Sequence, residues 1–73
     1  MGPYDATFRS LCRKAQLLHL EVSAHRDPQH LQTVIIIWEA GEELVSKGFC
    51  EATGDHNANV WLERQLAAYS QWQ

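Results

Sequence analysis

Residues 33–41, TVIIIWEAG, place five large apolar side chains in a row shortly before a glycine. The β-branched residues Val34–Ile37 locally favour a strand. The flanks favour a helix instead: Asp27-Pro28 resembles an N-cap followed by a first-turn proline, and Lys47-Gly48 is typical of a helix C-terminus. About twenty residues separate these signals, which is too many for one strand. The sequence therefore predicts a helix over 28–47.

An apolar stripe covers about half the circumference of this predicted helix, from Leu31 to Val45. Gly41 falls inside the stripe and costs about 1 kcal/mol relative to alanine in a helix interior. A close crossing with another helix is therefore the favoured reason for Gly41. Ile36 points away from the stripe, which is equally compatible with a single exposed isoleucine and with a contact surface.

Two further helices are predicted, over 4–24 and 57–71. The first carries apolar residues at alternating steps of four and three: Tyr4, Phe8, Leu11, Ala15, Leu18 and Val22. The second presents Leu62, Leu66 and Tyr69 on one face. Three helices with short connections predict an all-α fold, a small antiparallel three-helix bundle that forms a single helical domain over 1–73.

The length, the net charge and the cysteine content of the chain limit the classes of function that are plausible. The chain has 73 residues and a formal net charge of −3, with six basic and nine acidic residues, which argues against a broad phosphate-binding surface. A chain this short has a thin core and commonly recruits a second subunit. Cys12 and Cys50 are interpreted as reduced, semi-buried thiols. No secretory signal and no apolar run of membrane-spanning length are recognised, so a cytoplasmic location is expected.

Chemistry-bearing residues show no motif. His19, His25, His30, His56 and the two cysteines lack the short paired spacings of a zinc site. No metal, no cofactor and no enzymatic activity are expected. The alternative function is a small DNA-binding transcriptional regulator with a helix-turn-helix-like unit made of the second and third predicted helices. The long turn and the single cation of the third helix, Arg64, argue against it.

The apolar fraction of 45% exceeds what so small a core can hide. Tryptophan concentrates at binding hot spots. The alternative interpretation is that Trp38 belongs to the core and that Trp61 and Trp72 are partly exposed residues covering it. The sequence therefore predicts a non-enzymatic, protein-binding regulator or adaptor that acts through its helices on a larger protein and forms a homodimer. The predicted partner-binding residues are Leu17, Leu20, Ile36, Trp61 and Trp72, with Arg13 and Glu39 at the rim.

Overall fold

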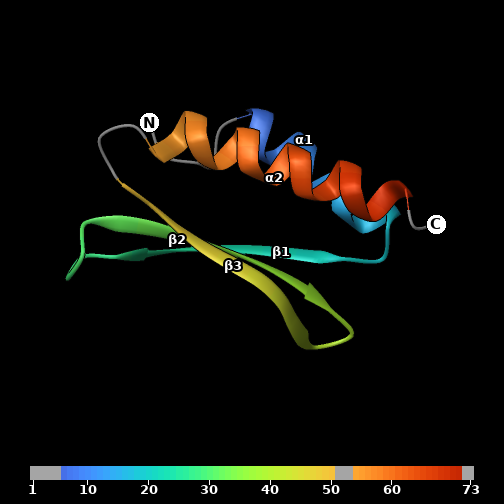
Figure 1. The fold of residues 1–73 in the computed structure, drawn as a ribbon, viewed down its shortest axis with the longest axis horizontal. Coiled ribbons are helices and arrows are strands. Elements are labelled where there is room, and N and C mark those ends of the chain that lie inside the picture. The colour runs from blue at the N-terminus through green and yellow to red at the C-terminus, as the bar shows by residue number, and fades with distance from the viewer. Residues whose placement is uncertain (1–5, 51–53, 72–73) are drawn as a thin grey trace.

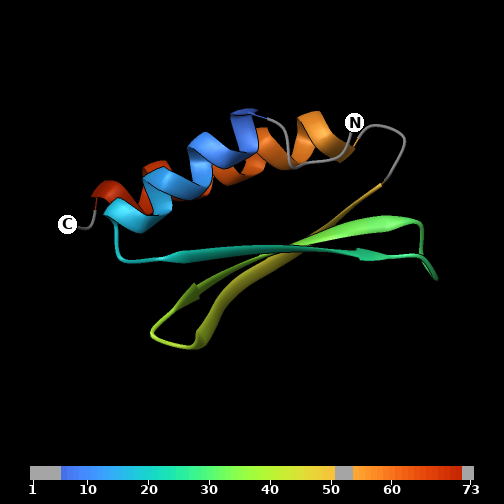
Figure 2. The same cartoon turned by 180° about the vertical axis from the view of Figure 1, so that it is seen from behind.

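The apolar run 34–38 lies in the central strand of an antiparallel sheet in the computed structural model, which describes residues 6–50 and 54–71. The described elements are, in chain order, α1 (Ala6–Leu17), β1 (Glu21–Asp27), β2 (Gln32–Glu39), β3 (Glu42–Cys50) and α2 (Gly54–Gln71). The strands are ordered β1-β2-β3, and α1 and α2 lie side by side on one face of the sheet (Figures 1 and 2). The prediction of an all-α three-helix bundle is wrong: the fold is α+β.

The predicted helix 28–47 is replaced by two strands and a tight turn. Glu39 pairs with Glu42, so Ala40 and Gly41 form a two-residue hairpin loop, and their φ angles are 51° and 83°. Positive φ at both central residues defines the type I′ turn, whose twist matches that of the flanking strands. Gly41 therefore serves this turn and not a helix crossing. With no helix in residues 28–47, all of which are described, the predicted helix-turn-helix-like unit does not exist.

Asp27, predicted to be the N-cap of a helix, instead ends β1 and begins the hairpin loop between β1 and β2. The backbone N–H of Gln29 donates to Oδ1 of Asp27 at 3.1 Å. An N-cap aspartate makes the same contact with the second residue of a helix, and an Asx-turn makes it in a loop. The local chemistry of Asp27-Pro28 is therefore compatible with both structures, and the pairing of β1 with β2 decides between them.

The first predicted helix, 4–24, ends early, at Leu17. His19 has a φ angle of 62°. Its backbone N–H donates to the carbonyl oxygen of Gln16 at 3.0 Å, and the N–H of Leu20 donates to the carbonyl oxygen of Ala15 at 2.9 Å. These two bonds are a Schellman cap, in which a residue in the left-handed region stops the helix. Histidine occupies the position usually held by glycine, so the sequence carried no strong stop signal.

The third predicted helix is confirmed as α2, although α2 begins at Gly54 rather than at residue 57. The core lies between the helix pair and the sheet. Its buried apolar residues are Phe8, Leu11, Ala15, Leu20, Ile35, Ile37, Phe49, Ala58, Leu62 and Leu66. The alternating spacing in α1 and the leucine face of α2 were thus correctly identified as core.

The central strand β2 is apolar on both of its faces, which explains the unbroken run in the sequence. Ile35 and Ile37 are fully buried beneath the helices, at 0% exposure. Val34, Ile36 and Trp38 alternate with them and are half-buried on the opposite face, which no described element covers. We call this the open face.

A hydrogen bond ties the open face together at one end. The indole Nε1–H of Trp38 donates to Oγ of Ser23 at 2.8 Å, across the β1–β2 pair. This bond satisfies the polar atom of Trp38 and holds its ring against the sheet, as buried or half-buried tryptophans generally require.

The molecule is a small compact globule. Its Cα radius of gyration is 11.8 Å, close to the value of about 11 Å expected for a compact chain of this length. Within the described residues, neither helix is both long enough and apolar enough to traverse a lipid bilayer.

Candidate functional site

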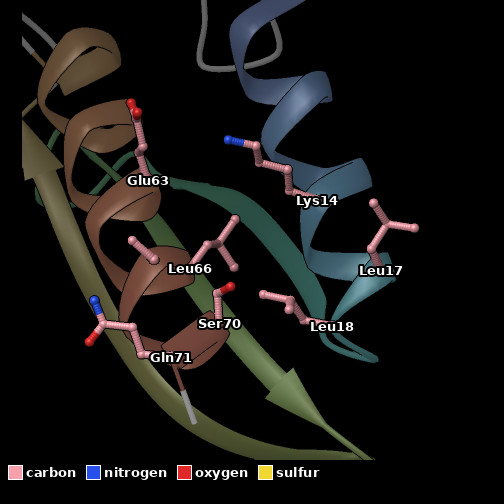
Figure 3. A pocket seen from close by; sticks show the side chains of 8 residues that line it. Lys14, Leu17, Leu18, Glu63, Leu66, Ser70 and Gln71 are labelled. Atoms are coloured by element: carbon pink, nitrogen blue, oxygen red, sulfur yellow. The ribbon is translucent and has the colours of Figure 1, made fainter. Parts of the chain in front are cut away.

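A groove runs along the seam between α1 and α2, on the side of the helices away from the sheet. Its main hollow has a volume of about 520 Å³ and is lined by the C-terminal halves of both helices (Figure 3). The lining residues are Lys14, Leu17, Leu18, Glu63, Leu66, Ala67, Ser70 and Gln71. We call this hollow the interhelical groove.

The apolar part of the interhelical groove is incompletely covered. Leu66 is buried in the core and Leu18 is half-buried, whereas Leu17, at the last residue of α1, is 80% exposed. In Figure 3 the side chain of Leu17 extends from α1 on the side away from α2, at the outer edge of the groove, whereas Leu18 points toward α2. A leucine left in water forgoes about 1.5–3 kcal/mol of burial free energy, which makes it a natural anchor for a partner.

The charged residues of the groove stand at its other end. Lys14 on α1 and Glu63 on α2 line both the main hollow and a second one of about 390 Å³ that continues toward the N-terminus of α1. Lys14 and Glu63 thus place a positive charge on one wall of the groove and a negative charge on the facing wall (Figure 3). Such charges orient a bound segment more than they strengthen its binding.

The structure distributes the predicted partner-binding residues over separate surfaces. Leu17 and Arg13 are exposed on α1, Ile36 lies on the open face, and Glu39 is exposed where β2 enters the type I′ turn. Trp61 is half-buried on α2 and Trp72 lies outside the described residues.

The expectation that Leu20 lies on an outer surface is wrong. Its side chain is 2% exposed because the Schellman cap turns the chain from α1 into the core. In a helix continued to residue 24 it would have pointed outward. A homodimer in which an outer surface around Leu17 and Leu20 contacts another around Ile36 therefore has no geometric basis within this fold.

Sequence reasoning missed most of the interhelical groove. Lys14, Glu63 and Ser70 were not singled out, because the seam forms only when α1 and α2 lie next to each other over a sheet. The neighbouring pair Leu17-Leu18 was the available signal: one of two successive helical leucines must face away from the core.

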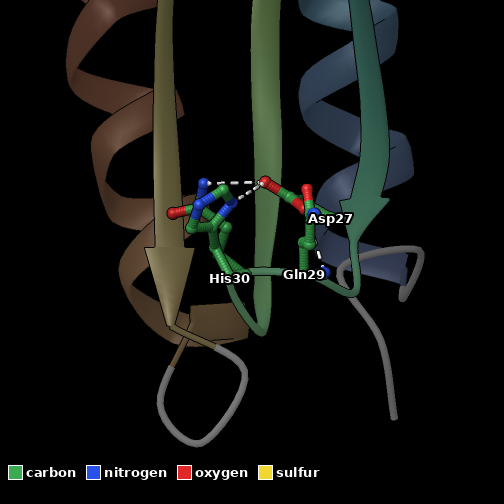
Figure 4. A network of polar contacts seen from close by, with 4 residues as sticks. Asp27, Gln29 and His30 are labelled. Carbon is green, nitrogen blue, oxygen red and sulfur yellow. Dashed lines mark hydrogen bonds and ion pairs between the residues drawn. The ribbon is translucent and has the colours of Figure 1, made fainter.

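A polar network organises the β1–β2 loop (Figure 4). Nδ1 of His30 lies 2.7 Å from Oδ2 of Asp27, and Nε2 of Gln32 donates to the same oxygen at 3.4 Å. The hydrogen bond with His30 is the largest cause that lowers the pKa of Asp27 below its usual value, opposed by partial desolvation. This network shapes the loop. In the described part of the chain, no group of three or more His, Cys, Asp or Glu side chains is arranged to hold a metal ion.

The two thiols differ in environment. Cys12 and Cys50 are both free, as expected; Cys12 is half-buried, and burial raises its pKa. Cys50, expected to be semi-buried, is exposed at the end of β3.

The geometry above was compared with known proteins. No protein-family model, no curated protein sequence and no solved structure matches this chain.

Proposed function

We propose that the chain is a small non-enzymatic regulator or adaptor of the cytoplasm that binds an apolar segment of a larger protein in the interhelical groove. The observation that carries the proposal is the 80% exposure of Leu17 beside this groove. The twelve residues of α1 give a seam of about 18 Å, which suits about three turns of a partner helix. An amphipathic helix docked by a few apolar anchors is the binding mode that such a groove favours.

The proposal includes self-association through a different surface. Leu17 and Ile36 lie on opposite sides of the sheet, so a contact between their two surfaces would join copies head to tail and extend into a chain. A closed homodimer must use one patch twice. We assign the open face to this contact, because a two-fold axis near Ile36 would lay its apolar row against the same row of the second copy. Sedimentation of the Ile36→Lys variant tests it: a dimer that persists would contradict the assignment.

The test of the main proposal compares two exposed leucines. Leu17→Glu introduces a charge beside the interhelical groove, while Leu31→Glu introduces the same charge at the tip of the β1–β2 loop, where leucine is 61% exposed. Removing a hot-spot anchor weakens binding by about 10- to 100-fold. Quantitative affinity enrichment from the native cell, followed by mass spectrometry and a binding titration with the purified partner, measures the loss.

The outcomes separate clearly. A partner retained by wild type and by Leu31→Glu, but lost from Leu17→Glu, is expected. Equal retention by both variants contradicts the role of the groove, and the absence of any stoichiometric partner contradicts the proposed function itself. Circular dichroism of each variant confirms that the fold is unchanged.

A further inference from the structure

The strand β3 forms one edge of the described sheet and is highly accessible. Every residue of β3 except Val45 and Phe49 is exposed. Alternate residues of an edge strand direct their N–H and C=O groups outward, where another strand can pair with them. Gly48 has no side chain because the side chain of Gln32 occupies the place where its Cβ would lie, so the accessible groups of β3 at this position are those of its backbone.

A second groove lies beside this edge, between β3 and α2. Its volume is about 590 Å³, and it is separate from the interhelical groove because it shares no lining residue with it. Its lining residues are Lys47, Gly48, Phe49, Cys50, Asn57, Val60, Trp61, Arg64 and Gln65. We call it the edge groove.

The floor of the edge groove is aromatic. The ring centroids of Phe49 and Trp61 are 5.7 Å apart, with their planes tilted by 59°. Phe49 is only 7% exposed, so Trp61, which is half-buried, supplies the accessible ring surface. A partner side chain that packs on Trp61 would find a rigid apolar surface, as at many interface hot spots.

The rim of the edge groove is cationic. Lys47 on β3 and Arg64 on α2 are the charged members of its described lining, and Nζ of Lys47 lies 5.7 Å from the centroid of the Phe49 ring. The chain as a whole carries a net charge of −3, so this local pair of cations stands out against an acidic background. Cations on both walls of a groove favour an anionic occupant.

We propose that the edge groove binds an extended, acidic segment of a partner protein, which adds to β3 as a further strand. Main-chain hydrogen bonds to the edge of β3 supply affinity, an apolar side chain packs on Trp61, and carboxylates lie against Lys47 and Arg64. A single-stranded nucleic acid fits the edge groove less well, because binding successive phosphates and bases requires more than two cations and one accessible ring. This site goes beyond the proposed function, because it differs in surface, in partner conformation and in charge.

A titration of the full-length protein with short capped peptides tests the proposal. The probe alternates Glu and Val; one control replaces Glu with Lys, and another keeps the Glu–Val sequence but carries N-methyl groups on alternate amides. Backbone NMR shifts locate the binding, and calorimetry measures it. The acidic peptide should bind with shifts and slowed amide exchange in β3, and both controls should bind more weakly by at least about tenfold.

Charge-reversed variants complete the test. Lys47→Glu combined with Arg64→Glu should weaken the acidic peptide by roughly tenfold or more, while Arg26→Glu, on the opposite edge strand β1, should change it by less than about twofold. Lys47→Gln with Arg64→Gln replaces the reversed variant if that one fails to fold. Leu17→Glu should bind the acidic peptide as wild type does, because Leu17 does not line the edge groove. A loss of binding at the interhelical groove can therefore be distinguished from a loss at the edge groove.

Several outcomes overturn the proposal. These are no binding at millimolar peptide, equal binding by the charge-reversed variant, equal binding of the N-methylated peptide, protection in β1 instead of β3, or tighter binding of an oligothymidylate than of the acidic peptide.

Discussion

Single replacements of Ile35, Ile36 and Ile37 by valine should lower the free energy of unfolding by amounts that alternate along β2. The losses should be larger at the first and third positions than at the second. Ile35 and Ile37 are 0% exposed beneath the helices, whereas Ile36 is half-buried on the open face. Valine keeps the β-branched shape and removes one methylene, which is worth about 0.8 kcal/mol when fully buried and 0.5–1.5 kcal/mol in measured cores.

The expected losses are therefore about 1 kcal/mol for Ile35→Val and Ile37→Val, and about 0.3 kcal/mol for Ile36→Val. For a domain of this size, 1 kcal/mol lowers the melting temperature by roughly 4–8 °C. A chain of 73 residues has a total stability of about 4–11 kcal/mol, so all three variants should remain folded.

Urea unfolding followed by circular dichroism measures the three losses, at two protein concentrations. Equal losses at all three positions, independent of concentration, would refute the alternation of β2 and with it the open face. A loss at Ile36 that grows at the higher concentration has a different meaning: it indicates that a second copy buries this residue, as the proposed homodimer requires.

The other predictions concern the loops and one buried amide. Gly41→Ala should destabilise by about 1 kcal/mol because φ is 83°, and Ala40→Asn should stabilise by about 0.5 kcal/mol; thermal unfolding reads both, and the opposite order would exclude the type I′ turn. His30→Ala should raise the pKa of Asp27 in an NMR titration. Because the folded pKa of Asp27 lies below the unfolded one, its stabilising contribution is present above the unfolded pKa and is lost as pH falls through the folded pKa, and His30→Ala should reduce this acid sensitivity. Oδ1 of Asn59 has no hydrogen-bond partner among the residues that the structure describes, and the residue is only 9% exposed. Asn59→Leu should therefore stabilise the protein by about 1 kcal/mol in urea unfolding, and a loss of stability would point to an unrecognised partner of this oxygen.

Parts of the fold that depend on local periodicity could be predicted from the sequence. The spacing of Phe8, Leu11 and Ala15 identified the buried face of α1, and Leu62 and Leu66 identified that of α2. These buried faces were predicted correctly because a helix places its core contacts within one short, regular segment of the sequence.

The secondary structure of the middle of the chain could not be predicted in this way, because the residues that mark the ends of its elements are compatible with more than one structure. Asp27 makes one and the same hydrogen bond in a helix cap and in an Asx-turn. Ala40 occupies a left-handed position usually held by asparagine or glycine, and His19 does so at the end of α1, which removed the residues that normally mark these breaks. A strand that is apolar on both faces also lacks the alternation by which strands are recognised.

The candidate sites were harder to predict than the helices. Both grooves lie between elements that are distant in the sequence: α1 with α2, and β3 with α2. Leu17 and Trp61 were identified as surplus apolar surface, but the cations Lys47 and Arg64 come together only through the packing of α2 against the sheet edge.

The position of residues 33–38 in the middle of the sheet also governs how the protein tolerates heat and high-level production. TVIIIW is β-prone, uncharged and free of proline, the composition that assembles into cross-β fibrils when it is accessible. In the native sheet β1 and β3 occupy both hydrogen-bonding sides of β2, and their charged residues, such as Arg26 and Lys47, oppose edge-to-edge pairing with uncharged strands such as TVIIIW from other copies. The outer strands thus act as gatekeepers, and detachment of either one, well before global denaturation, would be the event that starts irreversible precipitation.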